Sequence, residues 1–232
     1  MEIPLFLAMT AAEFRGAEVM PPHFGWMACH FSSYGVGLSN VPTALPPGGM
    51  LMLNDRTPIG GHDPETVAGR LCEAAQALEC DCILLDFQRE GYEELTCVAG
   101  AVLKQASCPV GISALYADGF DCPVLVPPIP PYVPPEEALS HWDGRELWLE
   151  VSTEGTRIAV TEQGSRYAPL DHYVPGEKTH FDPTLHCHYG ITVEEEQILF
   201  DIGRTEEDLT SLLKAVKSLG VSRAIGLWQE IR

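Results

Sequence analysis

The chain has 232 residues, of which 45% are hydrophobic and 20% charged, and its formal net charge at pH 7 is −19. This length suits one large α/β domain, and no apolar run reaches the roughly 18 residues that a membrane-spanning helix needs. A surface this acidic repels phosphate backbones, so we expect neither nucleic acid nor a membrane as a partner.

The first residues favour a strand over an export signal. Glu2 stands where a signal peptide carries positive charge, and Pro4 interrupts the short apolar run. A cytoplasmic location is therefore the expectation. Several of the eight cysteines lie inside apolar segments and there is no Cys-x-x-Cys pair, so we expect reduced thiols without a zinc or redox role.

Short apolar runs alternate with amphipathic helical runs along the chain, which is the pattern of a parallel sheet wrapped by helices. Most of the runs are continuously apolar, as buried parallel strands are. Eight of them are predicted as strands: 3–9, 25–31, 49–54, 82–87, 109–114, 122–127, 146–151 and 224–229. Eight such strands indicate a closed (β/α)8 TIM-like barrel, and we expect it to be one domain over residues 1–232.

Three helices are predicted: one after Asp63, one from about Tyr92 to Ala106, and one from Thr205 to about Leu219. Pro64 suits the first helical position, Thr205 with Asp208 resembles a capping box, and Gly220 suits a helix end. Other connections, such as 115–121, are too short for a full helix. The barrel is therefore expected to be reduced, with helices shortened or missing, and exposed outer strand faces favour a homodimer.

Two segments interrupt the alternation. Residues 126–135 read VPPIPPYVPP, which predicts a stiff, extended loop that walls a cleft, with a ligand for a proline-recognition domain as the alternative. Residues 152–203 form an insertion before the last helix. Alternating apolar and polar residues there predict a small antiparallel excursion near the barrel mouth.

Working residues in such barrels lie at the carboxyl ends of strands and in the loops that follow. That position selects a set of carboxylates, amides and aromatics: His30, Tyr34, Asp55, Asp86, Gln88, Glu90, Tyr116, Glu150 and Trp228. Such groups suit a sugar, and no cofactor is indicated. His186 and His188 share a strand face but have no matching carboxylate spacing, so we expect no metal site.

Residues 81–88 read DCILLDFQ, which resembles the D-x-x-D-x-D-x-E motif on strand four of the family 18 (chitinase-like) glycoside hydrolases. Asp81 and Asp86 fall on the first and third acidic positions. Leu84 replaces the second, and Gln88 replaces the glutamate.

The closing segment 197–230 also resembles that family, because a strand ending in Asp, an acidic helix start, a Gly turn and a final strand ending in Trp follow in order. The resemblance implies an amino-sugar ligand, with Trp228 as the floor of its subsite. A small cell-wall fragment would suit a cytoplasmic protein better than chitin.

The resemblance implies a substrate-assisted mechanism, in which the glutamate protonates the leaving oxygen and the neighbouring Asp orients the sugar's acetamido group. Gln88 has no carboxylic proton to give, and general acid catalysis contributes about 10² to 10⁴-fold. A non-hydrolytic or very weakly active glycan-binding barrel is therefore one hypothesis. A second is a hydrolase with a relocated acid such as Glu90, which would reach the cleft if the strand end bends.

A third hypothesis is a structural or partner-binding barrel with no sugar site. Each candidate residue has an ordinary structural interpretation that supports it. Asp86 could simply accept backbone hydrogen bonds, Trp228 could belong to the core, and Glu150 could point outward. Tyr34 and Tyr116 could be plain rim residues.

Overall fold

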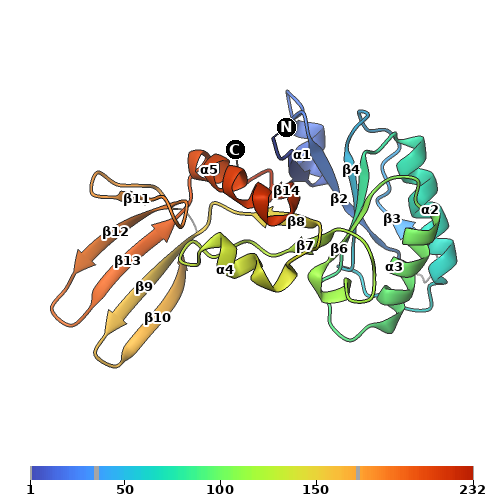
Figure 1. The fold of residues 1–232 in the computed structure, drawn as a ribbon. Coiled ribbons are helices and arrows are strands. Elements are labelled where there is room, and N and C mark those ends of the chain that lie inside the picture. Colours follow the sequence, from blue (N-terminus) through green and yellow to red (C-terminus); the bar gives the residue numbers. More distant parts are fainter. Residues whose placement is uncertain (1, 34–36, 171–172, 232) are drawn as a thin grey trace.

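Eight parallel strands close into a barrel in the computed structural model, which describes residues 2–33, 37–170 and 173–231 (Figure 1). The strands follow one another in chain order, and β1 pairs with both β14 and β2 to close the ring. They are β1 (Leu5–Met9), β2 (Phe24–Phe31), β4 (Met50–Asn54), β5 (Cys82–Asp86), β6 (Val110–Ser113), β7 (Val124–Val126), β8 (Leu147–Val151) and β14 (Val221–Leu227). The short strand β3 (Leu38–Ser39) adds antiparallel to β2. The predicted TIM-like barrel is confirmed.

The helical layer is reduced, as the short connections predict. Full-length helices are α2 (Pro64–Ala77), α3 (Glu93–Gln105) and α5 (Glu206–Val216). The remaining helical elements are short: α1 (Ala11–Gly16), η1 (Ala114–Tyr116), α4 (Pro135–Leu139), η2 (Ser140–Trp142) and η3 (Lys217–Leu219). Within the described ranges, no helix is both long and apolar enough to cross a membrane.

The predicted helix ends are present. Asp63 accepts a hydrogen bond from the Thr66 N–H, and Thr205 and Asp208 form the reciprocal capping box. Gly220 has φ 90°, the left-handed geometry that favours glycine after a helix. The predicted bounds of the last strand, 224–229, are wrong, because β14 begins directly after Gly220 and the chain already turns at residues 228–230.

Strand alternation separates two apolar cores. Interior side chains of the barrel form one cluster: Phe6, Ala8, Met50, Met52, Cys82, Leu84, Leu125, Trp148 and Ile225. The intervening residues of β5, Ile83 and Leu85, pack outward against α2 and α3. Trp148 fills the interior across β6, where a Cβ on Gly111 would lie 2.3 Å from its ring. The interior is thus a packed core rather than a pore.

The insertion forms a separate five-stranded antiparallel sheet, which projects from the barrel beyond α4 and α5 (Figure 1). Its strand order is β10 (Gly164–Leu170), β9 (Gly155–Thr161), β13 (Ile198–Gly203), β12 (Cys187–Val193) and β11 (His180–Asp182). The predicted antiparallel excursion is confirmed. Its five strands all lie between β8 and α5 in the chain.

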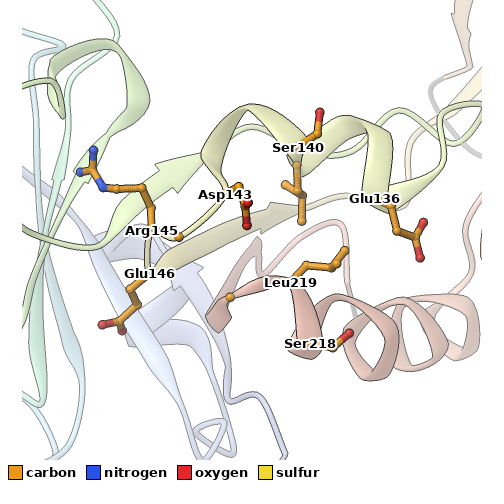
Figure 2. A pocket seen from close by; sticks show the side chains of 10 residues that line it. Glu136, Ser140, Asp143, Arg145, Glu146, Ser218 and Leu219 are labelled. Carbon is orange, nitrogen blue, oxygen red and sulfur yellow. The ribbon is translucent and has the colours of Figure 1, made fainter.

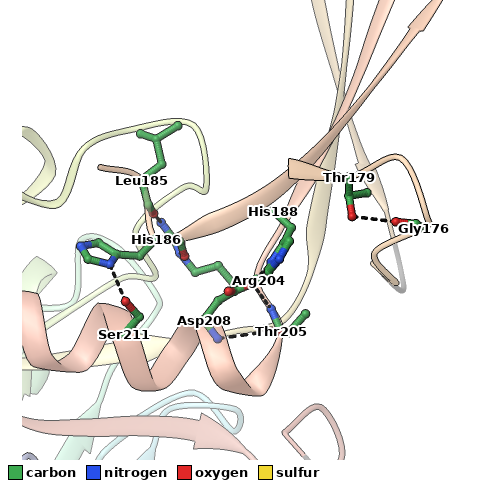
Figure 3. Close-up of polar contacts among 9 residues, drawn as sticks. All are labelled: Gly176, Thr179, Leu185, His186, His188, Arg204, Thr205, Asp208 and Ser211. Atoms are coloured by element: carbon green, nitrogen blue, oxygen red, sulfur yellow. Dashed lines mark hydrogen bonds and ion pairs between the residues drawn. The ribbon is translucent and has the colours of Figure 1, made fainter. Parts of the chain in front are cut away.

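One buried arginine ties this sheet to the barrel. Arg204 follows β13, is 3% exposed, and donates to the carbonyl oxygens of Leu185 (3.0 Å) and His186 (3.2 Å) (Figure 3). It also donates to the Ile129 carbonyl in the proline-rich segment. Burial lowers the pKa of this guanidinium to about 10, so it stays charged at neutral pH.

A second polar tie lies beside Arg204 at the start of α5. The buried Asp208 carboxylate accepts from the Thr205 N–H at 2.9 Å and lies 2.8 Å from Nδ1 of His188 on β12 (Figure 3). One side chain therefore caps the helix and anchors a strand of the inserted sheet.

The proline-rich segment connects β7 to α4 and is not extended throughout. The Val133 N–H donates to the Pro130 carbonyl at 3.1 Å and closes a turn, and Pro135 begins α4. The prediction of a wall beside a cleft agrees with the position of Pro128, which lines a hollow at the barrel mouth.

Candidate functional site

Alternation along β5 carries Asp86 into the barrel mouth. Cys82 and Leu84 are interior residues, and Asp86 follows with the same parity at the carboxyl end of the strand. Its strand neighbour in register is Asn54 on β4. The mouth therefore begins where the interior changes from apolar to polar side chains.

Asp86 is held by Gln88, the residue that the sequence resemblance aligns with the family's glutamate. The Gln88 side-chain amide donates to Oδ1 of Asp86 at 2.5 Å. Burial raises the pKa of Asp86 and the Asp55 charge adds to this, whereas the Gln88 hydrogen bond lowers it. The pair can orient a polar group of a ligand, but Gln88 cannot act as a proton donor in general acid catalysis.

Glu150 is the second carboxyl group of the mouth. It follows Trp148 with the same parity on β8 and therefore points inward rather than outward. Burial, with a smaller contribution from the Asp86 charge, raises the pKa of Glu150 to about 7. Two carboxyl groups, each with a raised pKa, thus share one low-dielectric site, which is an arrangement characteristic of functional sites.

A hollow of about 240 Å³ joins these groups. Asp86 and Glu150 line it together with Glu230, whose carboxylate accepts from the Ser152 hydroxyl at 3.0 Å. A fourth carboxylate, Glu154, also lines it with Ser152 and Gly226. The rest of its lining is apolar: Ala8, Met27, Met52, Pro128, Val151, Ile225 and Leu227. Among the described residues, no aromatic side chain lines it, so a ring-stacking floor is not part of this hollow.

Asp55 and Tyr116 build the loop after β5 rather than the hollow. The buried Asp55 carboxylate accepts from the backbone N–H groups of Gln88 (3.1 Å) and Arg89 (2.8 Å). The Tyr116 hydroxyl donates to the Arg89 carbonyl, and its ring packs edge-on against Phe87 at 5.9 Å. These contacts fix the position from which the Gln88 side chain reaches Asp86.

The remaining predicted residues lie around the rim or elsewhere. His30 Nδ1 is 2.8 Å from the Phe31 carbonyl and 3.1 Å from the Thr57 hydroxyl, so it joins β2 to the loop after β4. Trp228 is half-buried in the turn after β14, and its backbone N–H donates to the Ala8 carbonyl at 3.0 Å. Glu90 is exposed in a turn. Tyr34 lies outside the described residues.

Met27 and Met52 form the apolar side of the hollow and are not among the residues that position at strand ends selects. Register could have identified Met52, since it precedes Asn54 by two positions and therefore faces the same way as Asp86. Met27 lies next to a register shift in the β2–β4 pairing. A change of register of this kind cannot be read from an apolar run.

A larger open hollow of about 700 Å³ lies at the opposite end of the barrel, between α4 and η3 (Figure 2). Two of its charged side chains already serve structural contacts. Arg145 donates to the carbonyls of Phe120 (3.0 Å) and Cys122 (3.3 Å), and Glu146 accepts from Ser222 at 2.6 Å. In TIM-like barrels this amino-terminal end serves stability, so we place the candidate site at the mouth.

No group of three or more His, Cys, Asp or Glu side chains in the described ranges is arranged to hold a metal ion. The prediction that His186 and His188 share a strand face is wrong, because His186 lies in the turn before β12 with φ 50° and only His188 lies on the strand. His186 Nδ1 lies 2.9 Å from the Ser211 hydroxyl, and His188 pairs with Asp208.

No protein-family profile matches the sequence, and no curated protein sequence is similar to it. The fold is nevertheless similar to solved structures. A family 18 N-acetylglucosaminidase from Paenibacillus barengoltzii matches 97% of this chain and 94% of its own, with a TM-score of 0.61 and 9% identity. The spore cortex-lytic enzyme SleL from Bacillus cereus matches 97% of this chain and 70% of its own, with a TM-score of 0.60 and 10% identity.

A chitinase-like agglutinin from Robinia pseudoacacia is a third similar structure, with a TM-score of 0.56 and 10% identity over 95% of this chain and 93% of its own. At such identities the likeness shows the fold alone. The chain thus has the fold of the family 18 glycoside hydrolases, as the sequence resemblance implies, and the chemistry of its mouth has to be argued from its own residues.

Proposed function

We propose that this protein is a non-hydrolytic or very weakly active glycan-binding barrel whose ligand is a small N-acetylated amino-sugar fragment. The observation that carries the proposal is the 2.5 Å hydrogen bond from the Gln88 amide to Asp86 at the mouth. An amide in this position orients a carboxylate without supplying a proton, which preserves recognition and removes general acid catalysis.

The chemistry of the hollow suits an acetamido group. Asp86 and Glu150 offer hydrogen-bonding oxygens at one side, and Met27 and Met52 offer an apolar surface for a methyl group. The volume of about 240 Å³ favours a small ligand over a polymer chain. The likeness to a chitinase-like agglutinin supports a binding role on this fold, and the likeness to an N-acetylglucosaminidase supports the sugar class.

A calorimetric titration with N-acetylglucosamine oligomers of two to four sugars tests the proposal. We expect binding in the micromolar to millimolar range and no shorter products in the mixture afterwards. Asp86→Ala should abolish the heat, while Glu90→Gln, at an exposed position outside the hollow, is the matched control and should bind as the unmodified protein does. If millimolar oligomer gives no heat, the amino-sugar proposal is wrong.

The alternative function is a hydrolase with a relocated acid, and Glu150 rather than Glu90 is the residue that favours it. A carboxyl group with a pKa of about 7 is half protonated at neutral pH and can donate a proton. Shorter products that disappear in Glu150→Gln, with binding retained, would establish this alternative. Products that persist in that variant would require a different acid.

A further inference from the structure

The inserted sheet has one apolar face. Residues that pair in register across the sheet share a face. Ile191 and Val193 of β12 pair with Phe200 and Ile198 of β13. These two β13 residues pair in turn with Ile158 and Val160 of β9. We call this set the apolar face: Ile158, Val160, Tyr167, Tyr189, Ile191, Val193, Ile198 and Phe200. It spans four neighbouring strands, β10, β9, β13 and β12.

The opposite face of the same sheet is partly covered by the chain itself. Tyr173 packs over it so closely that a Cβ on Gly203 would lie 2.3 Å from the tyrosine ring. Arg157 and Asp201 form a bidentate ion pair on this face, with distances of 2.6 and 2.7 Å. This face therefore has its own partners within the chain.

The apolar face is bare over its outer half. Tyr132 of the proline-rich segment contacts Tyr167 near the barrel, with ring centroids 5.2 Å apart. Farther out, Val193 is 75% exposed, Ile191 50% and Ile198 39%. Contiguous apolar exposure of this kind marks an interaction site, because singly scattered apolar residues are common on surfaces but neighbouring ones are not.

Acidic side chains border the bare part. Val160 and Ile198 share one open hollow with Glu162, Glu194, Glu195 and Glu196, which lie in the two hairpin turns at the tip of the sheet (Figure 1). The ion pairs among the described residues are Arg157–Asp201, His188–Asp208 and Arg223–Glu146, and none of them involves these glutamates. The border therefore carries negative charge that no ion pair among the described residues neutralises.

We propose that the apolar face docks one basic amphipathic helix of a partner polypeptide, with its apolar stripe on the sheet and its lysines or arginines on the glutamates. Three strand spacings of about 4.8 Å give the face a width of about 14 Å, which fits one helix of about 10–12 Å diameter. Charge complementarity selects a cationic partner.

The same features exclude other occupants. Two copies meeting face to face would bring their glutamate borders together on chains of net charge −19. The face measures about 14 by 17 Å for five residues per strand, whereas a standard protein interface needs about 800 Å² on each side. Anionic lipid surfaces and nucleic acids are repelled by the same border. The docking surface is separate from the barrel mouth and does not depend on the glycan proposal.

The probe for the test is a fluorescent 14-residue peptide of leucine and lysine, with the leucines at helical spacing. We expect micromolar affinity that weakens as salt rises. Val193→Thr with Ile191→Thr should weaken binding about tenfold or more, because the buried methyl groups are lost. Val19→Thr is the matched control, since Val19 is 78% exposed on the barrel, and it should bind the peptide unchanged.

Charge is tested separately with the triple variant Glu194→Gln, Glu195→Gln and Glu196→Gln, compared with Glu18→Gln, Glu136→Gln and Glu137→Gln elsewhere. Only the first should weaken binding, by about tenfold, and circular dichroism should show both folded. A peptide with glutamate in place of lysine should not bind. The proposal is overturned if the double threonine variant of the apolar face binds the peptide as tightly as the Val19→Thr control. It is also overturned if sedimentation shows a dimer that Val193→Thr dissociates, because the occupant of the face would then be a second copy of the chain.

Discussion

The barrel and the inserted sheet are stabilised in different ways. The barrel buries large side chains on both sides of its strands, with Trp148 and Phe6 inside and Ile83 and Leu85 outside. The sheet keeps most of its side chains at least partly exposed and joins the barrel through polar ties around Arg204 and Asp208. Apolar burial determines where the barrel forms, whereas a few hydrogen bonds determine where the sheet is held.

Removing Trp148 should have the largest effect on stability. Its side chain is fully buried and fills the interior against Gly111. We expect Trp148→Ala to lower the free energy of unfolding by about 4 kcal/mol, measured by urea denaturation.

Trp148→Phe is the control for this substitution. It keeps most of the ring and removes an indole N–H that has no hydrogen-bond acceptor among the described residues. The loss should therefore be less than half as large. Equal losses in the two variants would mean that the interior does not depend on the volume of this side chain.

Removing the Arg204 guanidinium should destabilise the inserted sheet more than the barrel. Arg204→Met keeps the length of the side chain but leaves the carbonyls of Leu185, His186 and Ile129 without their donor. We expect a loss of about 3 kcal/mol, with hydrogen exchange rising in β12 and β13 before it rises in β5. Uniform exchange throughout the chain would contradict a separately held sheet.

The exposed pair of Arg157 and Asp201 provides the matched control for Arg204. Arg157 is also an arginine on the inserted sheet, but its side chain is 45% exposed. Arg157→Met should cost less than about 1 kcal/mol, because exposed ion pairs contribute little. The contrast tests whether burial of the guanidinium, rather than its charge, holds the sheet.

The two regions also differ in how much of them the sequence predicts. The eight barrel strands follow from continuous apolar runs. The starts of α2 and α5 follow from Asp63 and Thr205, and the end of η3, which continues α5, follows from Gly220. In the sheet, β10 is not indicated, because nearly all of its side chains are exposed and no apolar alternation marks it. A buried strand requires apolar residues at regular positions, and this pattern can be recognised in the sequence. An exposed hairpin strand has no such requirement.

The candidate site is predicted in part for a related reason. Position at strand ends selects Asp86, Gln88 and Glu150, which the structure brings to the mouth. It equally selects Asp55 and Tyr116, whose polar atoms bond the backbone of the loop after β5. Whether a polar side chain at a strand end faces the cavity or the loop depends on the path of that loop, which is set by tertiary contacts.

An effect smaller than those of Trp148 and Arg204 concerns Glu150, whose ionisation makes stability depend on pH. Its pKa is raised from 4.5 to about 7 in the folded protein, by burial first and by Asp86 second. Between these values folding raises the number of protons bound at Glu150, so the contribution of Glu150 to stability falls as pH rises from 4.5 to 7 and is constant above that range.

Glu150→Gln removes this titration. We expect the variant to gain about 2 kcal/mol of stability relative to the unmodified protein at pH 8, after allowance for partial solvent access, and little at pH 4.5. Glu90→Gln, at an exposed position, should show no such difference. Parallel profiles of unfolding free energy against pH for the unmodified protein and Glu150→Gln would mean that Glu150 ionises as freely in the folded state as in the unfolded state. Water would then reach the mouth, and Asp86 and Glu150 would not share a low-dielectric hollow.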